Sequence, residues 1–447
     1  MRFPFLAAAV SLLVPGCTEP VLPRMARAQL EPLNVLIIIT DDQRNRGTLG
    51  VMPATRRIFA RRGTRFPNAF ATTPLCCPAR ASLFTGQYAH NHGVRNNGDA
   101  RQLDQDRTLQ AYLAQDGYRN ALFGKFFYAF SVDTDPQHFD DWATTRAKRY
   151  SDILWNVHGQ AETIQQYSTD YIRDRAVEFI ADGETEDLRP WFMVLAPQAP
   201  HKPFTPAARH AGAPVPRWAG NPAVRERDRS DKPPYVRKWN VDRDALRSTR
   251  RKQLRSLMAV DDMTRVVFST LRDLGEARHT LAFFLSDNGL MWGEHGLPSK
   301  RHSYTDSVEV PLFVRWPGEV LAGKRDRRLT GIIDVAPTIL NAAGVTPDHP
   351  MDGRSLLSAT TRDRILLEFW AEKSVPSWAS IRTRGLQYAE YYRDDGTLSF
   401  REYYKLRPDP WQLVNLLHDG DLRTRPGTRA LRRQLQADRR CAGAECP

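Results

Sequence analysis

Four short apolar runs give the strongest pattern in the chain. They cover residues 33–40, 120–123, 191–196 and 280–286, and the first of them is rich in β-branched residues. Apolar residues fill nearly every position of these runs rather than every second one, which predicts strands buried on both faces of a parallel sheet. The strands would form the centre of a large core.

Amphipathic segments lie between these runs. Residues 109–116, 171–181 and 257–274 carry apolar side chains at helical spacing. Strands that alternate with helices favour an α/β fold, a doubly wound and mostly parallel sheet with helices on both faces.

The pattern changes near residue 360, where we place a domain boundary. The segments that follow are typical of a small antiparallel sheet with a helix at the end: strands 365–370, 378–383, 386–392 and 400–406, and helix 428–440. Asp394-Asp395-Gly396 predicts a turn between the last two strands. A chain of 447 residues exceeds the roughly 250–300 residues at which single cores stop growing. We therefore expect a main domain over 33–360 and a smaller α+β domain over 361–447.

Composition is that of an ordinary folded protein, with 41% hydrophobic and 26% charged residues. The net charge of +13 comes mostly from arginine, which is dense in residues 217–255. Such a surface would attract polyanions, including sulfated glycans. It is also typical of an arginine-biased proteome, and both interpretations stay open. Because no zinc-finger, RRM or helix-turn-helix signature accompanies the charge, we expect no nucleic-acid partner.

The first residues resemble an export signal. A basic start and a short uncharged stretch lead to Gly16-Cys17, a pattern of bacterial lipoprotein signal peptides. We expect a signal peptide over 1–16, lipidation of Cys17 and a linker over 17–32, with simple secretion as the alternative. The protein would then be exported and would contact a membrane only through a lipid anchor.

The chain has five cysteines. Cys441 and Cys446 are close together at the C-terminus, and in an exported protein we expect them to form a disulfide. Cys17 belongs to the lipoprotein pattern. The adjacent pair Cys76 and Cys77 needs another explanation.

Polar residues follow each of the four predicted strands. In an open parallel sheet, ligands bind beyond the carboxyl ends of the strands. The residues placed there are Asp41, Asp42, Lys125, His201, Asp287 and Asn288. Carboxylate and amide oxygens suit calcium or, less well, magnesium, whereas zinc prefers nitrogen and sulfur. Turns and helix caps would use the same residue types, but their matched positions favour a metal site.

A helix is predicted to begin at Cys76. Pro78 suits its first turn and Gly86 its C-terminal cap. Cys76 would lie at the helix N-terminus, where free amides favour an anion. Arg80, four residues later, would lie on the same helical face. This geometry predicts a nucleophile beside an anion-binding site.

Here the chain resembles the type I, formylglycine-dependent sulfatase family. Cys76-x-Pro78-x-Arg80, extended by Thr85-Gly86, matches the family signature, and similar context extends from Asn34 to about Leu416. The double cysteine with the segment from Tyr88 to His92 looks most like the branch of glucosamine-6-sulfatases and heparan endosulfatases. The resemblance implies an alkaline-phosphatase-like fold.

The resemblance also implies a mechanism for hydrolysing sulfate esters, such as those of N-acetylglucosamine-6-sulfate units. A formylglycine-generating enzyme would convert Cys76 to 3-oxoalanine (formylglycine), whose hydrate attacks sulfur. Calcium would be held by residue 76 with Asp41, Asp42, Asp287 and Asn288. Arg80, Lys125 and Lys300 would neutralise the sulfuryl oxygens, and His201 or Lys300 would protonate the leaving alcohol.

One position departs from the family pattern. Many sulfatases have a histidine two residues after the lysine matched by Lys125, and this chain has Phe127. The base that helps to restore the aldehyde is therefore unassigned. His90, His92 and His295 are candidates, although a structural role is the simpler expectation for each.

One acidic pair and the second cysteine have simpler interpretations. Asp261 and Asp262 lie within an amphipathic segment and are expected to be solvated or helix-bonded, and Cys77 is expected to be a small buried apolar residue.

Two other functions stay open at this level. One is hydrolysis of phosphodiesters or phosphonate monoesters, which related members of the superfamily perform with the same nucleophile. The other is a silent lipoprotein that binds sulfated glycans through its arginines. The complete set of polar residues at the strand ends argues against the silent protein.

Overall fold

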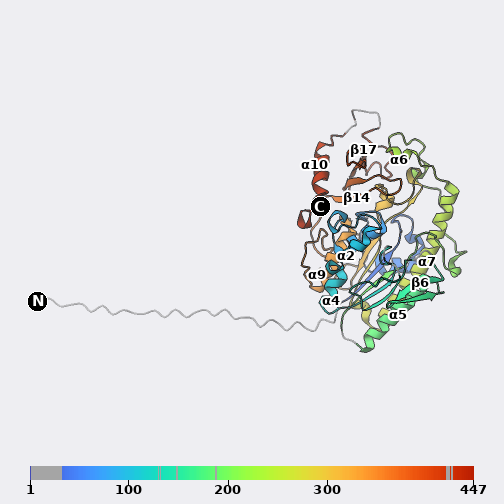
Figure 1. The fold of residues 1–447 in the computed structure, drawn as a ribbon, viewed down its shortest axis with the longest axis vertical. Helices are drawn as coiled ribbons and strands as arrows, with labels where there is room; N and C mark the ends of the chain where they lie inside the picture. Colours follow the sequence, from blue (N-terminus) through green and yellow to red (C-terminus); the bar gives the residue numbers. More distant parts are fainter. Residues whose placement is uncertain are drawn as a thin grey trace. The chain divides into compact units, whose positions relative to one another are not determined.

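The centre of the fold is a nine-stranded sheet (Figure 1). The computed structural model describes residues 1, 33–128, 130, 132–146, 149–186, 189–418, 423 and 426–447. The expected signal peptide after its first residue, Cys17 and the whole of the expected linker lie outside these residues. Five neighbouring strands form the parallel middle of the sheet, in the order β9 (Thr280–Ser286), β1 (Asn34–Thr40), β8 (Trp191–Ala196), β4 (Arg119–Gly124) and β5 (Asp141–Thr144).

The four strands predicted from apolar runs are confirmed as β1, β4, β8 and β9. Antiparallel strands extend both edges of the sheet and were not predicted: β12 (Leu312–Arg315) and β2 (Thr64–Arg65) on one side, β6 (Ile153–Val157) and β7 (Gln160–Ile164) on the other. These strands are short, and β7 is largely exposed and polar.

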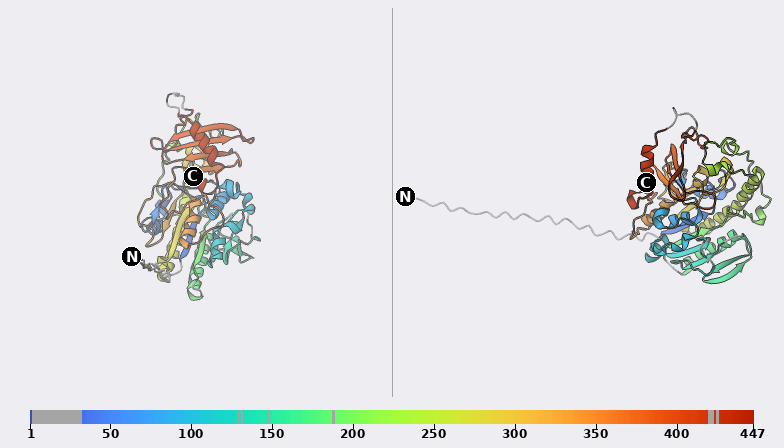
Figure 2. Two further views of the ribbon diagram at one scale, coloured as in Figure 1. Left: turned by 90° about the vertical axis from the view of Figure 1, so that its left-hand side faces the viewer. Right: turned by 45° about the horizontal axis from the view of Figure 1, so that its top comes forward.

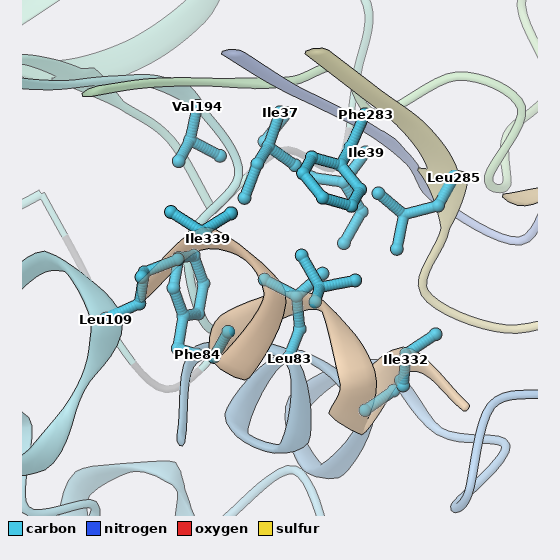
Figure 3. Packing of buried hydrophobic residues seen from close by; sticks show 14 of the residues in the cluster. Ile37, Ile39, Leu83, Phe84, Leu109, Val194, Phe283, Leu285, Ile332 and Ile339 are labelled. Atoms are coloured by element: carbon cyan, nitrogen blue, oxygen red, sulfur yellow. The ribbon is translucent and has the colours of Figure 1, made fainter. Parts of the chain in front are cut away.

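Helices cover both faces of the sheet because successive side chains of each strand point to opposite sides. Alternate residues of β1 enter two separate hydrophobic clusters. One cluster contains residues of α2 (Cys76–Thr85), α4 (Leu109–Gln115) and α9 (Val335–Ala343), and the other contains residues of α5 (Ser168–Glu186) and α7 (Arg243–Asp273). Figure 3 shows Leu83 and Ile339 beneath Ile37 and Phe283. The doubly wound interpretation is confirmed.

The helix α7 is longer than predicted. The apolar pattern marks only residues 257–274, whereas the helix begins at Arg243. The Asp242 side chain caps it by accepting a hydrogen bond from the backbone N–H of Asp244 at 2.9 Å. The arginine-rich first half of α7 buries few apolar side chains, Leu246 and Leu254 among them, so hydrophobic periodicity is weak there.

A four-stranded antiparallel sheet forms the C-terminal part, as predicted. Its strands are β14 (Ile365–Phe369), β15 (Trp378–Arg382), β16 (Leu386–Tyr392) and β17 (Leu398–Lys405), followed by α10 (Arg429–Asp438). Figure 2 shows these strands gathered at one end of the central sheet. Both sheets belong to one compact unit, Pro32–Pro447, and the boundary near residue 360 stays a prediction.

Two smaller expectations in this part are also met. Gly396 has a φ of 78° in the turn between β16 and β17, a conformation that glycine adopts without steric cost. Cys441 and Cys446 form the expected disulfide. No helix among the described residues is long and apolar enough to cross a membrane.

Candidate active site

The carboxyl ends of β1 and β9 bring three carboxylates together. Thr40 and Ser286 are register partners, so the residues that follow them emerge side by side. The backbone N–H of Asp42 donates to Asp287 Oδ1 at 3.1 Å. Oxygen atoms of Asp41, Asp42 and Asp287 lie within 4.8 Å of one another, and all three residues are buried. The predicted convergence of strand ends is present.

Cys76 is the first residue of α2, as predicted. Leu75 before it is extended, and the helix ends at Gly86 in the left-handed conformation. The Cys76 thiol donates to Asp41 Oδ1 at 3.4 Å. The side chain is 3% exposed, so the cysteine lies in a buried cluster at a helix N-terminus.

Three cations surround this cluster. The Lys125 ammonium contacts the carboxylate of Asp41, and the Lys300 ammonium contacts the carboxylate of Asp42. Lys300 Nζ also lies 2.7 Å from the sulfur of Cys76. Arg80 Nε donates to Asp287 Oδ2 at 3.0 Å. Every cation named from the sequence is therefore within the cluster.

Arg80 keeps one nitrogen for a ligand. Its Nε is bound to Asp287, and its Nη1 donates to the carbonyl of Lys125 at 2.6 Å. Its Nη2 is buried and has no hydrogen-bond partner among the described residues. Leaving a buried charged donor unpaired is costly, and an oxyanion in the cluster would supply the missing acceptor.

Lys125 depends on the glycine before it. Gly124 has a φ of 115°, and a Cβ at this position would lie 2.2 Å from the carbonyl oxygen of Ala196. Only glycine fits this close approach of β4 to β8. This close approach of the two paired strands places Lys125 directly beyond the end of β4.

His201 lies on the more open side of the cluster. Its Nε2 is 3.7 Å from Asp42 Oδ2, and its side chain is 31% exposed. Nδ1 lies 2.7 Å from the carbonyl oxygen of Lys202, which assigns the proton to Nδ1 in the neutral ring. Tyr150 fixes the backbone by donating to the His201 carbonyl at 2.7 Å.

The cluster perturbs its own ionisable groups. Burial raises the pKa of the Cys76 thiol to about 12, and the negative charge of Asp41 adds to this effect. Burial also acts to raise the pKa of Asp41, but Lys125 and the other cations outweigh it and hold this pKa below its usual range. Burial and the charge of Asp41 raise the pKa of Asp287. The unmodified thiol is therefore protonated at neutral pH and a weak nucleophile.

The donor atoms at the strand ends fit a hard cation. The Asn288 amide donates to Asp42 Oδ1 at 2.6 Å, and its Oδ1 lies 3.4 Å from Lys300 Nζ. Three carboxylates and an amide oxygen are a ligand set for calcium or magnesium. In this structure the ammonium groups of Lys125 and Lys300 balance the carboxylate charge.

The histidines proposed as alternatives have structural partners. Val94 N–H donates to His92 Nδ1 at 3.1 Å and His92 Nε2 lies 3.0 Å from Ser82 Oγ, and burial lowers the His92 pKa to about 3. His90 binds Glu368 and the carbonyl of Cys441.

His295 is also held away from the cysteine. Its Nδ1 lies 2.8 Å from Glu226, and its ring packs on Tyr304. None of these contacts of the three histidines involves a residue of the cluster around Cys76. The structural interpretation therefore fits each histidine.

Phe127 and Cys77 are part of the core. Phe127 is 1% exposed, and its ring centroid lies 4.3 Å from that of Phe126. It packs where many sulfatases have a histidine, so the position is apolar here. Cys77 is fully buried in the same hydrophobic cluster, which confirms the expectation for it.

The expectation that Asp261 and Asp262 are solvated or bonded within their own helix needs correction. The Asp261 carboxylate is buried and accepts hydrogen bonds from the backbone N–H groups of Ala54 and Thr55 at 3.0 and 2.7 Å. The carboxylate therefore accepts from free backbone N–H groups of α1 (Pro53–Thr55), a helix that is distant from it in sequence. Asp262 pairs with Arg209 and His210. Neither carboxylate bonds only within its own helix.

A buried ionic network beside the site was not predicted. Arg44 donates to Glu294 at 2.9 Å and pairs with Asp306 at 2.5 Å. Its guanidinium also lies 4.3 Å from the ring centre of Trp292. The position of Arg44, two residues after Asp42, is the only sequence signal that could have drawn attention to it.

Comparison with known proteins places the chain among sulfatases. The family model described as "Sulfatase" matches residues 33–345, and a second model, "N-sulphoglucosamine sulphohydrolase, C-terminal", matches residues 293–440. The Sulf-1 homologs of Caenorhabditis elegans and Drosophila melanogaster are 28% and 30% identical and align with 82% and 80% of this chain. The alignments span only 56% and 34% of those longer proteins.

Further similarities cover most of both chains. Human N-acetylglucosamine-6-sulfatase is 29% identical, with 86% of this chain and 80% of the human protein aligned. A solved structure in complex with its substrate D-glucosamine-2-N,6-O-disulfate has a TM-score of 0.79 at 23% identity, covering 91% and 96% of the two chains. The phosphonate monoester hydrolase of Agrobacterium radiobacter has the same fold, with a TM-score of 0.70 at 24% identity and coverage of 91% and 96%. The chain belongs to the sulfatase family.

Proposed function

We propose that this protein hydrolyses sulfate esters of sugars, with residue 76 as the nucleophile. The proposal rests on one observation: Cys76, three carboxylates and three cations form a buried cluster at the N-terminus of α2. A sulfate ester carries negative charge on its oxygens, and the leaving oxygen gains more as its bond to sulfur breaks. A pre-arranged set of cations stabilises that charge without reorganising solvent.

Formylglycine is the proposed form of residue 76. Oxidation of the Cys76 side chain would supply a hydrated aldehyde, in which one hydroxyl attacks sulfur and the other allows sulfate to leave. A formylglycine-generating enzyme is the partner proposed to carry out this oxidation. The buried and protonated thiol would be a poor substitute for the hydrate.

Calcium is the proposed metal, held by carboxylate and amide oxygens at the strand ends. The ligands would be Asp41, Asp42, Asp287, Asn288 and modified residue 76. When bound, the ion would polarise the sulfate and lower the pKa of the attacking hydroxyl. Magnesium is the less favoured alternative because the three carboxylates among these five protein ligands exceed the one or two with which it is usually held.

The side chains divide the remaining work. Arg80 Nη2 is the open donor for a sulfuryl oxygen, and Lys125 and Lys300 would neutralise the others. His201 is proposed to protonate the leaving alcohol because it is the more exposed of the two candidate acids, with 31% of its side chain accessible against 5% for Lys300. An alcohol oxygen would reach it from the open side of the cluster.

A 6-sulfated glucosamine is the proposed substrate type. The human relative is named an N-acetylglucosamine-6-sulfatase, and the substrate in the similar solved structure is a glucosamine disulfate. The likeness to a phosphonate monoester hydrolase concerns the fold and does not by itself favour phosphorus substrates. A silent binding protein would have no use for the complete cluster.

Export is proposed on the names of the relatives. The fly relative is called an extracellular sulfatase, in keeping with the expected signal peptide. Lipidation of Cys17 stays a prediction, which mass measurement of the mature N-terminus in the native host would check.

A substrate screen tests the function. Protein from its native host would be assayed on 6-sulfated N-acetylglucosamine, an aryl sulfate and a phosphodiester, each with calcium and with a chelator. We expect turnover of the sulfated sugar that is lost with chelator and restored by calcium. Mass spectrometry of the peptide with residue 76 should show an aldehyde in place of CH₂SH. An unmodified thiol together with no sulfate release would overturn the proposal.

A further inference from the structure

The arginine-rich part of the sequence forms a groove of its own. A cavity of about 400 Å³ is lined by Val215, Pro216, Arg217, Trp218, Ala219, Arg247, Arg250 and Arg251. An adjoining cavity of about 240 Å³ shares Trp218, Ala219 and Arg247 with it and adds Arg225 and Arg243. We call these two cavities the arginine groove. Among the described residues that line it, none is acidic.

Several of these arginines are available to a ligand. Arg217, Arg225 and Arg251 are exposed, and within the described part of the chain no ion pair is found for them. Arg247 is also exposed and pairs with Asp244 at 2.9 Å on the helix surface. Uncompensated guanidinium groups bind sulfate through two parallel N–H bonds.

Contacts of a buried arginine hold the wall of the groove in place. Arg250 is 5% exposed, and its Nη1 donates to the carbonyl of Pro216 at 2.9 Å. Its guanidinium lies 5.7 Å from the ring centre of Trp218 and 5.2 Å from that of Trp292. Trp218 is thereby held half-buried, and it supplies an aromatic side chain to the lining of both cavities.

Topology places the groove at the same edge of the sheet as Cys76. β8 ends at Ala196, and β9 begins at Thr280, shortly after α7 ends at Asp273. The first turns of α7 therefore lie at the carboxyl edge. Consistent with this, the Gln253 amide donates to the carbonyl of Pro200 at 3.3 Å, next to His201.

Trp292 connects the groove with the site. One of its contacts is the guanidinium of Arg250 and another is that of Arg44, which follows the carboxylate pair of β1. The indole N–H of Trp292 donates to Gln253 at 2.6 Å. The groove and the cluster are thus separate positions on one edge.

We infer that the arginine groove binds a second sulfated segment of an oligosaccharide whose 6-sulfate occupies the active site. The inference rests on the proposed function and names a polymeric substrate for it. A monosaccharide in the active site carries no second sulfated sugar for the groove, whereas a longer chain that is sulfated along its length has sulfate groups for both positions. Nucleic acid has a similar charge, but it has no sulfate ester to place in the active site on this edge.

Binding to a variant without turnover tests the inference. The full chain with Cys76→Ala would be titrated with a heparin-derived octasaccharide by calorimetry, with and without R217E/R247E/R251E. We expect the groove substitutions to weaken binding roughly tenfold or more, because three favourable charge contacts become repulsive. The matched control is R57E/R61E/R62E, in the segment whose Phe59 packs on Phe268 near the other end of α7. It should change affinity by less than about twofold.

The remaining outcomes separate the groove from the active site. In protein with intact Cys76, the groove substitutions should leave turnover of the 6-sulfated monosaccharide unchanged. If no protein with intact Cys76 turned over the sulfated sugar, but the groove substitutions still weakened octasaccharide binding more than the control substitutions did, only the sulfatase proposal would be overturned. Equal weakening by both triple variants, or an oligonucleotide that competes as well as the octasaccharide, would overturn the groove. If R217E/R247E/R251E melts early, R217A/R251A replaces it, and unchanged octasaccharide affinity in that variant refutes the inference.

Discussion

The ammonium nitrogen of Lys300 lies 2.7 Å from the sulfur of Cys76 and also contacts the carboxylate of Asp42. One cation thus joins the proposed nucleophile to a proposed metal ligand. Lys300 is 5% exposed, so its charge acts at short range and with little screening by solvent. Changes at residue 76 and at the strand ends should therefore affect the same chemistry.

The two adjacent cysteines should differ completely in function. Cys76→Ala should abolish turnover, a loss on the order of a millionfold as for other removed nucleophiles, with little change in melting temperature. Cys77→Ala should keep turnover and lower stability by about 1 kcal/mol, because it shortens a fully buried side chain in the main core. Turnover assays and thermal unfolding of both variants check this. Retained activity in Cys76→Ala would refute the assignment of the nucleophile.

Arg80 should act through its unpaired nitrogen. In Arg80→Lys the single ammonium can keep the contact with Asp287, but the Nη2 donor aimed at the ligand is lost. We expect turnover to fall by about a hundredfold or more and inhibition by free sulfate to weaken. Arg328→Lys is the control, a partly buried arginine that binds the carbonyls of Ser358 and Leu356. If Arg80→Lys kept normal inhibition by sulfate, Nη2 would not be the oxyanion donor.

His201 should matter in proportion to the leaving group. A nitrophenolate leaves without a proton, whereas a sugar alkoxide needs one. His201→Gln should therefore reduce turnover of a sugar sulfate by about a hundredfold or more and that of 4-nitrophenyl sulfate much less. The kcat for the two substrates, measured side by side, checks the difference. Equal losses on both would assign His201 to binding rather than to proton transfer.

Features that depend on a single element could be predicted from the sequence. The strands β1, β8 and β9 are buried throughout and apolar at all their inner positions, and the carboxyl ends of parallel strands share one edge. The position of Cys76 follows from local helix signals, Pro78 and Gly86. The main residues of the candidate site could therefore be predicted from the sequence alone.

Features that depend on pairing between distant elements could not. Arg44 meets Glu294 and Asp306 only because β1 and β9 pair in one particular register. Asp261 caps a helix more than two hundred positions earlier in the chain, and no local pattern encodes that contact. The start of α7 was missed because its arginine-rich turns bury too few apolar side chains to show a period.

His90 and His92 should give stability opposite dependences on pH. Both ring nitrogens of His90 face acceptors, Glu368 at 3.0 Å and the carbonyl of Cys441 at 3.0 Å, so the doubly protonated ring satisfies both. Burial opposes this charge, but Glu368 outweighs it and raises the pKa of His90 above its ordinary 6.5. The contact is thus complete below about pH 6.5 and is lost as pH rises through the folded pKa.

His92 has the reverse sign, because burial lowers its pKa to about 3 and only the unfolded chain gains a proton as pH falls below about 6.5. The loss of unfolding free energy in His90→Gln, relative to the wild type, should be about 1 kcal/mol larger at about pH 5.5 than at about pH 9. For His92→Gln, the loss of unfolding free energy relative to the wild type should be smaller at the acidic pH than at the basic pH. Urea unfolding of the three proteins at both pH values measures this. Parallel pH profiles for the two variants would show that the protonated His90 does not hold the C-terminal sheet to α3 (Ala89–His92).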